Sequence, residues 1–265
     1  MTTILKGCIV SAPALGRLET SEHGYLIAEN GHITGIYPVL PEQYAGAPVE
    51  DYGDDLIVQS FADLHLHAPQ YPMLGTGMDL PLLDWLNTYA FPTEARFADT
   101  DYARTVYRQL SRELIAHGTT RVCMFSSLHT EATLILMEEL ERAGVTGYVG
   151  KVNMDRNSPD YLREASAEES AKATREWIRA VAERHYEHVQ PILTPRFTPS
   201  CSDELMELLH DIQKETGLPV QSHLSENLGE IAWVQELCPW AEFYGDAYDH
   251  FGMFGGKCRT IMAHC

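Results

Sequence analysis

The chain has 265 residues and a formal net charge of −19, from 19 Lys and Arg against 38 Asp and Glu. Hydrophobic residues make up 45% and charged residues 22%, an ordinary globular composition that argues against a disordered chain. The negative charge argues against nucleic-acid and anionic-membrane partners, because both favour basic surfaces. The six cysteines form no C-x-x-C pair, which argues against a zinc ribbon or a disulfide framework. No signal peptide or membrane-spanning stretch is recognisable, so we expect a cytoplasmic protein.

Residues 1–57 are expected to form a small β domain. Short apolar runs separated by turn residues lie at 8–10, 25–27 and 32–36. Asn30-Gly31 between two of these runs predicts a hairpin. A loop is expected from Pro41 to Asp55, which places the domain boundary near residue 57.

Residues 58–265 are expected to alternate strands with helices. Short, apolar, branched segments are typical of parallel strands buried on both faces, and they occur at 57–64, 120–126, 145–154, 190–195, 219–224 and 259–264. Apolar residues three and four apart predict helices over 101–116, 130–143, 167–186, 203–216 and 228–237. This order predicts an α/β fold with right-handed crossovers. A doubly wound parallel sheet and a (β/α)₈ barrel both fit it.

Capping residues mark several of the expected helix ends. Ser166-x-x-Glu169 and Asn227-x-x-Glu230 are capping-box patterns. Gly118, Gly144 and Gly217 follow the last helical residues, where glycine is favoured.

Four of the 12 histidines lie at the carboxyl ends of expected strands: His65 and His67 after the first, His223 on the fifth and His264 on the sixth. In a parallel barrel these strand ends meet at the face where active sites are built. His65 and His67 are two residues apart and therefore point the same way from a strand. With His223 they offer three imidazole nitrogens, which suit zinc or another borderline divalent metal. An isolated H-x-H can arise by chance, but its coincidence with the other strand ends favours a metal site.

Two further side chains follow strand ends. Glu226 comes three residues after His223, where it can exchange a proton with water activated by a metal. A carboxylate here is also favourable simply as part of a helix N-terminus. Arg196 and Phe197 end the fourth strand and can bind and stack a planar polar ring. Alternatively, they are a surface arginine beside a core phenylalanine.

These motifs together resemble the amidohydrolase superfamily, and within it the guanine deaminases. The blocks that carry the resemblance are His65–Pro72, Asp79–Tyr89, Phe91–Glu94, Thr194–Phe197, Ser222–Glu226 and Met262–Cys265. The H-x-H alone is typical of the whole superfamily, whereas the blocks between residues 65 and 94 are specific to the deaminases. The resemblance implies a zinc-dependent (β/α)₈ barrel that hydrolyses guanine to xanthine and ammonia, usually as a homodimer.

The resemblance also implies roles for individual residues. His65, His67 and His223 match the ligands of one zinc ion, although histidine ligands suit Fe²⁺ as well. Glu226 matches the carboxylate that moves protons, and His264 matches a histidine beside the metal and the bound ring. Gln70, Arg196 and Phe197 match residues that hold the purine.

One departure from the family concerns a fourth ligand, an aspartate of strand eight. Only six barrel strands are expected here, so no residue of this chain is assigned to that aspartate. We therefore expect a truncated barrel, a β domain that is the N-terminal part of a composite β-sandwich, and an inactive chain when it is isolated. Two alternatives stay open: an amidohydrolase that deaminates a pterin, a triazine or another nucleobase, and a non-catalytic metal-binding fragment.

Overall fold

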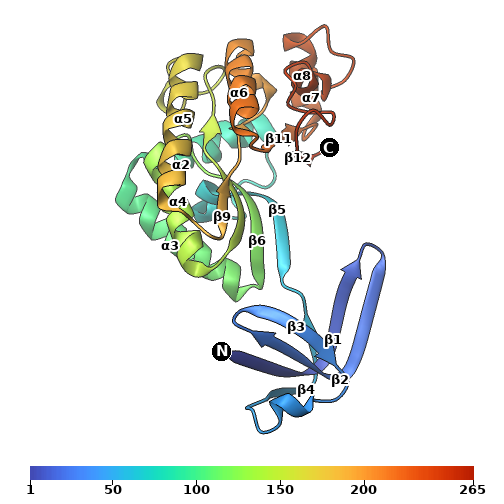
Figure 1. Cartoon of the computed structure of the whole chain (residues 1–265). Coiled ribbons are helices and arrows are strands. Elements are labelled where there is room, and N and C mark those ends of the chain that lie inside the picture. The colour runs from blue at the N-terminus through green and yellow to red at the C-terminus, as the bar shows by residue number, and fades with distance from the viewer. The chain divides into compact units, whose positions relative to one another are not determined.

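The computed structural model describes residues 1–265, which divide into two compact units, Met1–Ser60 and Phe61–Cys265. Figure 1 shows the course of the chain through both units. Each unit is described by itself.

The unit Met1–Ser60 is a four-stranded sheet in the order β3-β2-β1-β4. Its elements are β1 (Thr2–Ala14), β2 (Arg17–Glu29), β3 (His32–Tyr37), η1 (Glu42–Tyr44) and β4 (Glu50–Val58). β1 pairs antiparallel with β2 and parallel with β4. The hairpin predicted at Asn30-Gly31 is confirmed: Glu29 pairs with His32, and both turn residues have positive φ. Ile4, Ile27 and Tyr44 form the buried core of this sheet.

Two sequence predictions near the end of this unit are wrong. The loop expected from Pro41 to Asp55 ends early, because β4 begins at Glu50. The first seven residues of β4 are exposed, so the strand is held by its pairing with β1 and has no alternating apolar pattern to reveal it. The single strand expected over 57–64 is also divided. β4 ends at Val58, and β5 begins at Phe61 and continues to His67.

The unit Phe61–Cys265 contains the predicted parallel strands. They are β5 (Phe61–His67), β6 (Thr119–Phe125), β7 (Thr146–Gly150), β8 (Val152–Asn153), β9 (Val189–Pro191), β10 (Thr194–Pro195), β11 (Val220–Leu224) and β12 (Thr260–His264). β5, β6, β7 and β9 form one parallel sheet. Two further parallel pairs follow, β8 with β10 and β11 with β12. A parallel bridge between Leu193, just before β10, and Val220 of β11 connects these two pairs. Two of the six predicted strands are thus interrupted, one at Lys151 and one at residues 192–193.

The connections between these strands are helical. They include η2 (Ala68–Met73), α1 (Leu82–Trp85), the π-helical η3 (Leu86–Ala90), α2 (Phe91–Ala95), η4 (Arg96–Ala98), α3 (Thr100–Ala116), α4 (Thr130–Ala143), η5 (Asp160–Leu162), α5 (Ala167–Arg184), η6 (Thr198–Ser200), α6 (Asp203–Thr216), α7 (Leu228–Leu237) and α8 (Asp246–Asp249). The five long helices match the predicted ranges closely. In Figure 1, α3, α4, α5 and α6 follow one another as packed neighbours along the sheet. No helix is both long and apolar enough to span a membrane.

This mixed α/β fold, a parallel sheet covered by helices, agrees with an incomplete (β/α)₈ barrel. Its main core lies between the sheet and α3 to α5, where Tyr107, Leu136 and Trp177 are fully buried. On the inner side the strands approach closely at Gly150. A Cβ atom there would lie 1.7 Å from Thr194 Oγ1, so only glycine fits. Close packing of the strands in turn brings their carboxyl ends together.

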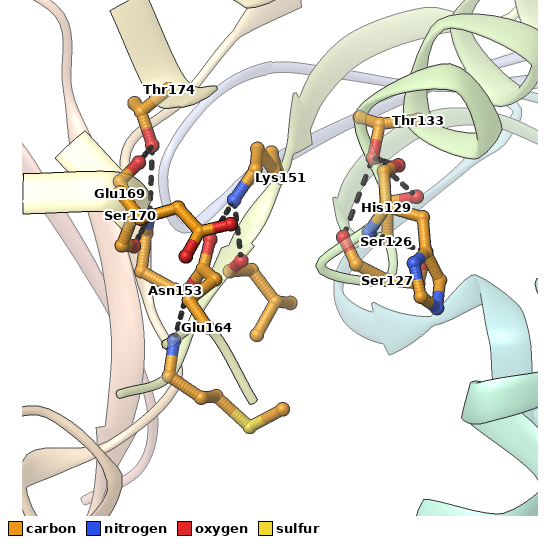
Figure 2. A network of polar contacts seen from close by, with 12 residues as sticks. Ser126, Ser127, His129, Thr133, Lys151, Asn153, Glu164, Glu169, Ser170 and Thr174 are labelled. Atoms are coloured by element: carbon orange, nitrogen blue, oxygen red, sulfur yellow. Dashed lines mark hydrogen bonds and ion pairs between the residues drawn. The ribbon is translucent and has the colours of Figure 1, made fainter. Parts of the chain in front are cut away.

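A buried polar network joins the strands to the segment before α5, as Figure 2 shows. Lys151, between β7 and β8, forms an ion pair with Glu164 and donates to the carbonyl oxygen of Val152. Glu164 also accepts from the backbone N–H of Met154 at 2.9 Å. Asn153 donates to the hydroxyls of Ser170 and Thr174 on α5, both at 2.8 Å. These contacts pair the buried charges and fix the loop that follows β8, while Asn153 Oδ1 has no hydrogen-bond partner.

Candidate active site

A cavity of about 260 Å³ lies at the carboxyl ends of β5, β11 and β12. It is lined by His65, Leu66, His67, Gln70, Leu82, Trp85, Leu86, Arg196, Phe197, His223, Glu226 and His264. All eight site residues predicted from the sequence therefore line one cavity. The parallel order of the strands explains this convergence, because their carboxyl ends face the same way.

The four strand-end histidines form one cluster. His65 and His67 lie two residues apart on β5, and their ring centroids are 5.1 Å apart. Ligand atoms of His65, His223 and His264 lie within 4.8 Å of one another. His67 joins through its Nε2 atom, which is 2.8 Å from Nε2 of His223. Nitrogen atoms from β5, β11 and β12 thus converge at spacings that a single metal ion can bridge.

The protonation of these histidines suits a metal. Burial lowers the pKa of His65 to about 4 and lowers the pKa of His67 and His223 well below the usual value. Neutral imidazoles can coordinate a cation, whereas imidazolium cannot. His223 Nδ1 is 2.5 Å from the carbonyl oxygen of Arg196, an acceptor that assigns the proton to Nδ1 and leaves a lone pair on Nε2. His67 Nδ1 is buried without a hydrogen-bond partner.

The ring of Phe125 packs against the histidines, a contact that the sequence does not predict. Phe125, at the carboxyl end of β6, is fully buried and stacks on His67 with ring centroids 4.5 Å apart. It also contacts the rings of His65 and His223. Phe125 restricts the orientation of three rings and excludes water from one side of them. Its strand-end position was visible in the sequence, but an apolar residue there is equally expected in an ordinary core.

A second part of the cavity lining, here called the wall, consists of Arg196, Phe197 and Gln70. Arg196 is 2% exposed and forms a bidentate ion pair with Glu94 of α2, with N–O distances of 2.5 and 3.0 Å. Gln70 Nε2 donates to the same carboxylate at 2.9 Å. Phe197 lies beside Trp233, with ring centroids 6.4 Å apart. The wall therefore combines fixed hydrogen-bonding groups with an aromatic face. Glu94 ends one of the sequence blocks that carry the resemblance, but the sequence alone assigns it no role.

Glu226 lies on the segment between β11 and α7, beside His264. Its Oε2 atom is 3.6 Å from His264 Nε2. Burial raises the pKa of Glu226, while His264 and Arg196 act in the opposite direction and Glu230 adds to the increase. A carboxyl group with a raised pKa can hold a proton near neutral pH and give it up in a reaction.

The chain belongs to the amidohydrolase family, which matches residues 56–265. Within that family it is similar to guanine deaminases. It is 45% identical over 217 residues to the guanine deaminase of Dictyostelium discoideum, an alignment that covers 82% of this chain and 48% of the relative. It is 38% identical over 220 residues to the guanine deaminase of Escherichia coli, with 82% and 48% covered.

A solved structure of a guanine deaminase has the same fold as this chain. The guanine deaminase of C. acetobutylicum with guanine bound in its active site superposes with a TM-score of 0.93 and 44% identity. The match covers 100% of this chain and 62% of that one. The chain thus spans about half the length of the curated relatives it matches. Membership of the amidohydrolase family implies a divalent metal, for which the histidine cluster is the evident place.

Proposed function

We propose that this chain carries the metal-binding and purine-binding residues of a guanine deaminase, which hydrolyses guanine to xanthine and ammonia. The observation that supports this most is the gathering of four histidines, a protonatable carboxyl group and a polar aromatic wall on one cavity. The similarity to guanine deaminases, one of them solved with guanine in its active site, supports the choice of substrate. In the reaction, a C–O bond to water forms at the carbon bearing the amino group, and the C–N bond to that group breaks.

His65, His67 and His223 are the proposed ligands of one divalent ion, which we take to be zinc. The donor set fits: the imidazoles are neutral, His223 directs Nε2 toward Nε2 of His67, and His67 Nδ1 has no competing partner. When bound, the ion supplies a water activated for attack at neutral pH. The resemblance implies an additional aspartate ligand, and no residue among the 265 is assigned to it.

Glu226 is the proposed proton carrier. Its Oε2 takes a proton from the attacking water and delivers it to the departing amino group, which leaves as ammonia. His264 lies beside Glu226 and the other histidines, so it is positioned to contact the reacting edge of the ring. Gln70 and Arg196 would hydrogen-bond the purine, and Phe197 would pack against its plane.

The test is an assay of the protein as its gene encodes it, supplied with guanine, adenine, cytosine, a pterin and a triazine in parallel. We expect xanthine and ammonia in equal amounts from guanine, with loss on chelation and recovery on addition of Zn²⁺. Metal analysis distinguishes zinc from iron. Turnover of a triazine, a pterin or another nucleobase in preference to guanine would contradict the substrate. Absence of turnover in a metal-loaded protein would favour a non-catalytic metal-binding role.

Three further proposals rest on the resemblance to the deaminases. They are a homodimer, a cytoplasmic location and a role in purine catabolism. Light scattering on the purified protein tests the homodimer directly. A monomer at micromolar concentration would contradict it.

A further inference from the structure

Glu94 lies behind the cavity wall and contacts two of its residues. It is 1% exposed and does not line the cavity, whereas Arg196 and Gln70 do. Arg196 donates to Oε2 through Nη1 and to Oε1 through Nη2, and Gln70 donates to Oε1 through Nε2. A single buried carboxylate therefore holds two side chains that reach it from η2 and from the end of β10.

The carboxylate of Glu94 determines which hydrogen-bonding atoms of Gln70 and Arg196 remain free for other partners. An ionised carboxylate only accepts hydrogen bonds, so it selects the NH₂ side of the Gln70 amide. The amide oxygen of Gln70 is then left for another partner. The bidentate contact also fixes the plane of the Arg196 guanidinium, whose remaining N–H groups are directed elsewhere. The wall consequently offers an acceptor from Gln70 and donors from Arg196.

The environment of the pair maintains this arrangement. The guanidinium carbon of Arg196 lies 5.1 Å from the ring centroid of Phe91, on the same helix as Glu94. Removal of the carboxylate would leave a buried cation without its partner, an unfavourable state that would displace the Arg196 side chain. The orientation of both wall residues therefore depends on Glu94.

We propose that Glu94 is a positioning residue that sets the hydrogen-bonding polarity of the cavity wall and thereby its preference among purines. This inference rests on the proposed function, in which the wall binds the purine. Guanine carries adjacent ring N–H and carbonyl groups, which match an acceptor beside donors. At the corresponding edge adenine has a ring nitrogen that accepts and an amino group that donates, the reverse order, so it is bound more weakly.

The test compares Glu94→Gln with the conservative Glu94→Asp and a matched control, Glu164→Gln. Glu164 is also a buried carboxylate paired with a cation, Lys151, but its hydrogen bonds are to Lys151 and Met154 and to no residue that lines the cavity. Calorimetry on the metal-loaded protein gives the affinity for guanine and for adenine. We expect Glu94→Gln to weaken guanine binding about 10- to 100-fold, to raise KM more than it lowers kcat, and to reduce the guanine-to-adenine ratio. Glu94→Asp should retain more of that ratio.

The control separates positioning from stability. Glu164→Gln should lower the melting temperature and leave the guanine-to-adenine ratio unchanged. If Glu94→Gln lowers the melting temperature in the same way and keeps the ratio, Glu94 has only a structural role and the inference is overturned.

A second measurement requires no turnover and no folded variant. In ¹⁵N-arginine-labelled wild-type protein, a bidentate pair should slow rotation of the Arg196 guanidinium and give separate Nη signals. Averaged signals would overturn the inference. Failure of wild-type protein to bind or deaminate guanine would instead contradict the proposed function, and the Arg196 signals would still decide whether Glu94 orients the wall.

Discussion

The position of Glu226 is set by a second buried carboxylate, Glu230. Glu230 Oε2 accepts from the backbone N–H groups of Glu226 and Asn227 at 2.9 and 3.2 Å, and its Oε1 accepts from Tyr244 at 2.6 Å. The capping box predicted at Asn227 and Glu230 is thus confirmed. The same contact also orders the residue proposed to carry the proton. The carboxylate of Glu230 therefore both caps α7 and fixes the backbone at Glu226.

Replacement of Glu226 by glutamine tests the proton carrier. An amide neither accepts the proton of water nor delivers one to the departing amino group, so kcat should fall about 10²- to 10⁴-fold. Metal content and guanine affinity should change little, because the amide has nearly the same size. Xanthine formation at the wild-type rate would contradict the proposed role, and Glu183→Gln, at an exposed position of α5, serves as the control.

Residues that act through side-chain contacts distant in sequence were the hardest to predict. His65, His67, His223 and His264 could be placed at strand ends, because strand position alone brings them together. Glu94 could not be given a role, since its function depends on Arg196, 102 residues further along the chain. Phe125 was missed because an apolar residue at a strand end has the same pattern in any core.

At the scale of the element, Glu141 links the end of α4 to the start of β9. Its carboxylate accepts from the backbone N–H groups of Glu187, His188 and Val189 at 2.9 to 3.2 Å. Partial burial acts to raise the pKa of Glu141, but these three hydrogen bonds outweigh it and lower the pKa below 4.5. The link is therefore strongest when Glu141 is ionised.

This lowered pKa predicts how stability depends on pH. A lowered pKa in the folded state contributes stability above the unfolded value of 4.5, and that contribution is lost as the pH falls through the folded value. We expect Glu141→Gln to lower the free energy of unfolding by about 1 kcal/mol near pH 7, with a smaller difference from wild type below about pH 4. Urea unfolding at both pH values measures this. A difference that stays constant with pH would contradict it.

The elements themselves could largely be predicted from the pattern of apolar residues. The long helices and the parallel strands bury continuous apolar faces, so their positions follow from the sequence. β4 could not be predicted, because its residues from Glu50 to Leu56 are exposed and only backbone pairing with β1 makes them a strand. Similarly, the interruption at residues 192–193 leaves no trace in hydrophobicity, because both are apolar, and Lys151 is only a single charged residue within its apolar run.

At the scale of the whole molecule, the histidine cluster connects β5 with β11 and β12. An ion bound there stabilises the folded state by an amount that rises with the logarithm of its free concentration, about 4 kcal/mol at 1,000 times Kd. Chelation should therefore increase hydrogen exchange in β11 and β12, with little change in β3 of the other unit. Mass spectrometry of exchange with and without chelator tests this. Equal exchange in both conditions would contradict a metal that joins these strands.

The histidines of the cluster lie far apart in the sequence, so they leave the ribosome at different times. His65 and His67 emerge early, but the cluster also needs His264, at the end of β12, which pairs in register with β11. Chains fold as they emerge, N-terminal parts first. The helices α3 to α6 can pack while the nascent chain still lacks His264, so a cavity containing only some of its nitrogen atoms precedes the complete one. All four histidines can therefore hold an ion together only after His264 has left the ribosome.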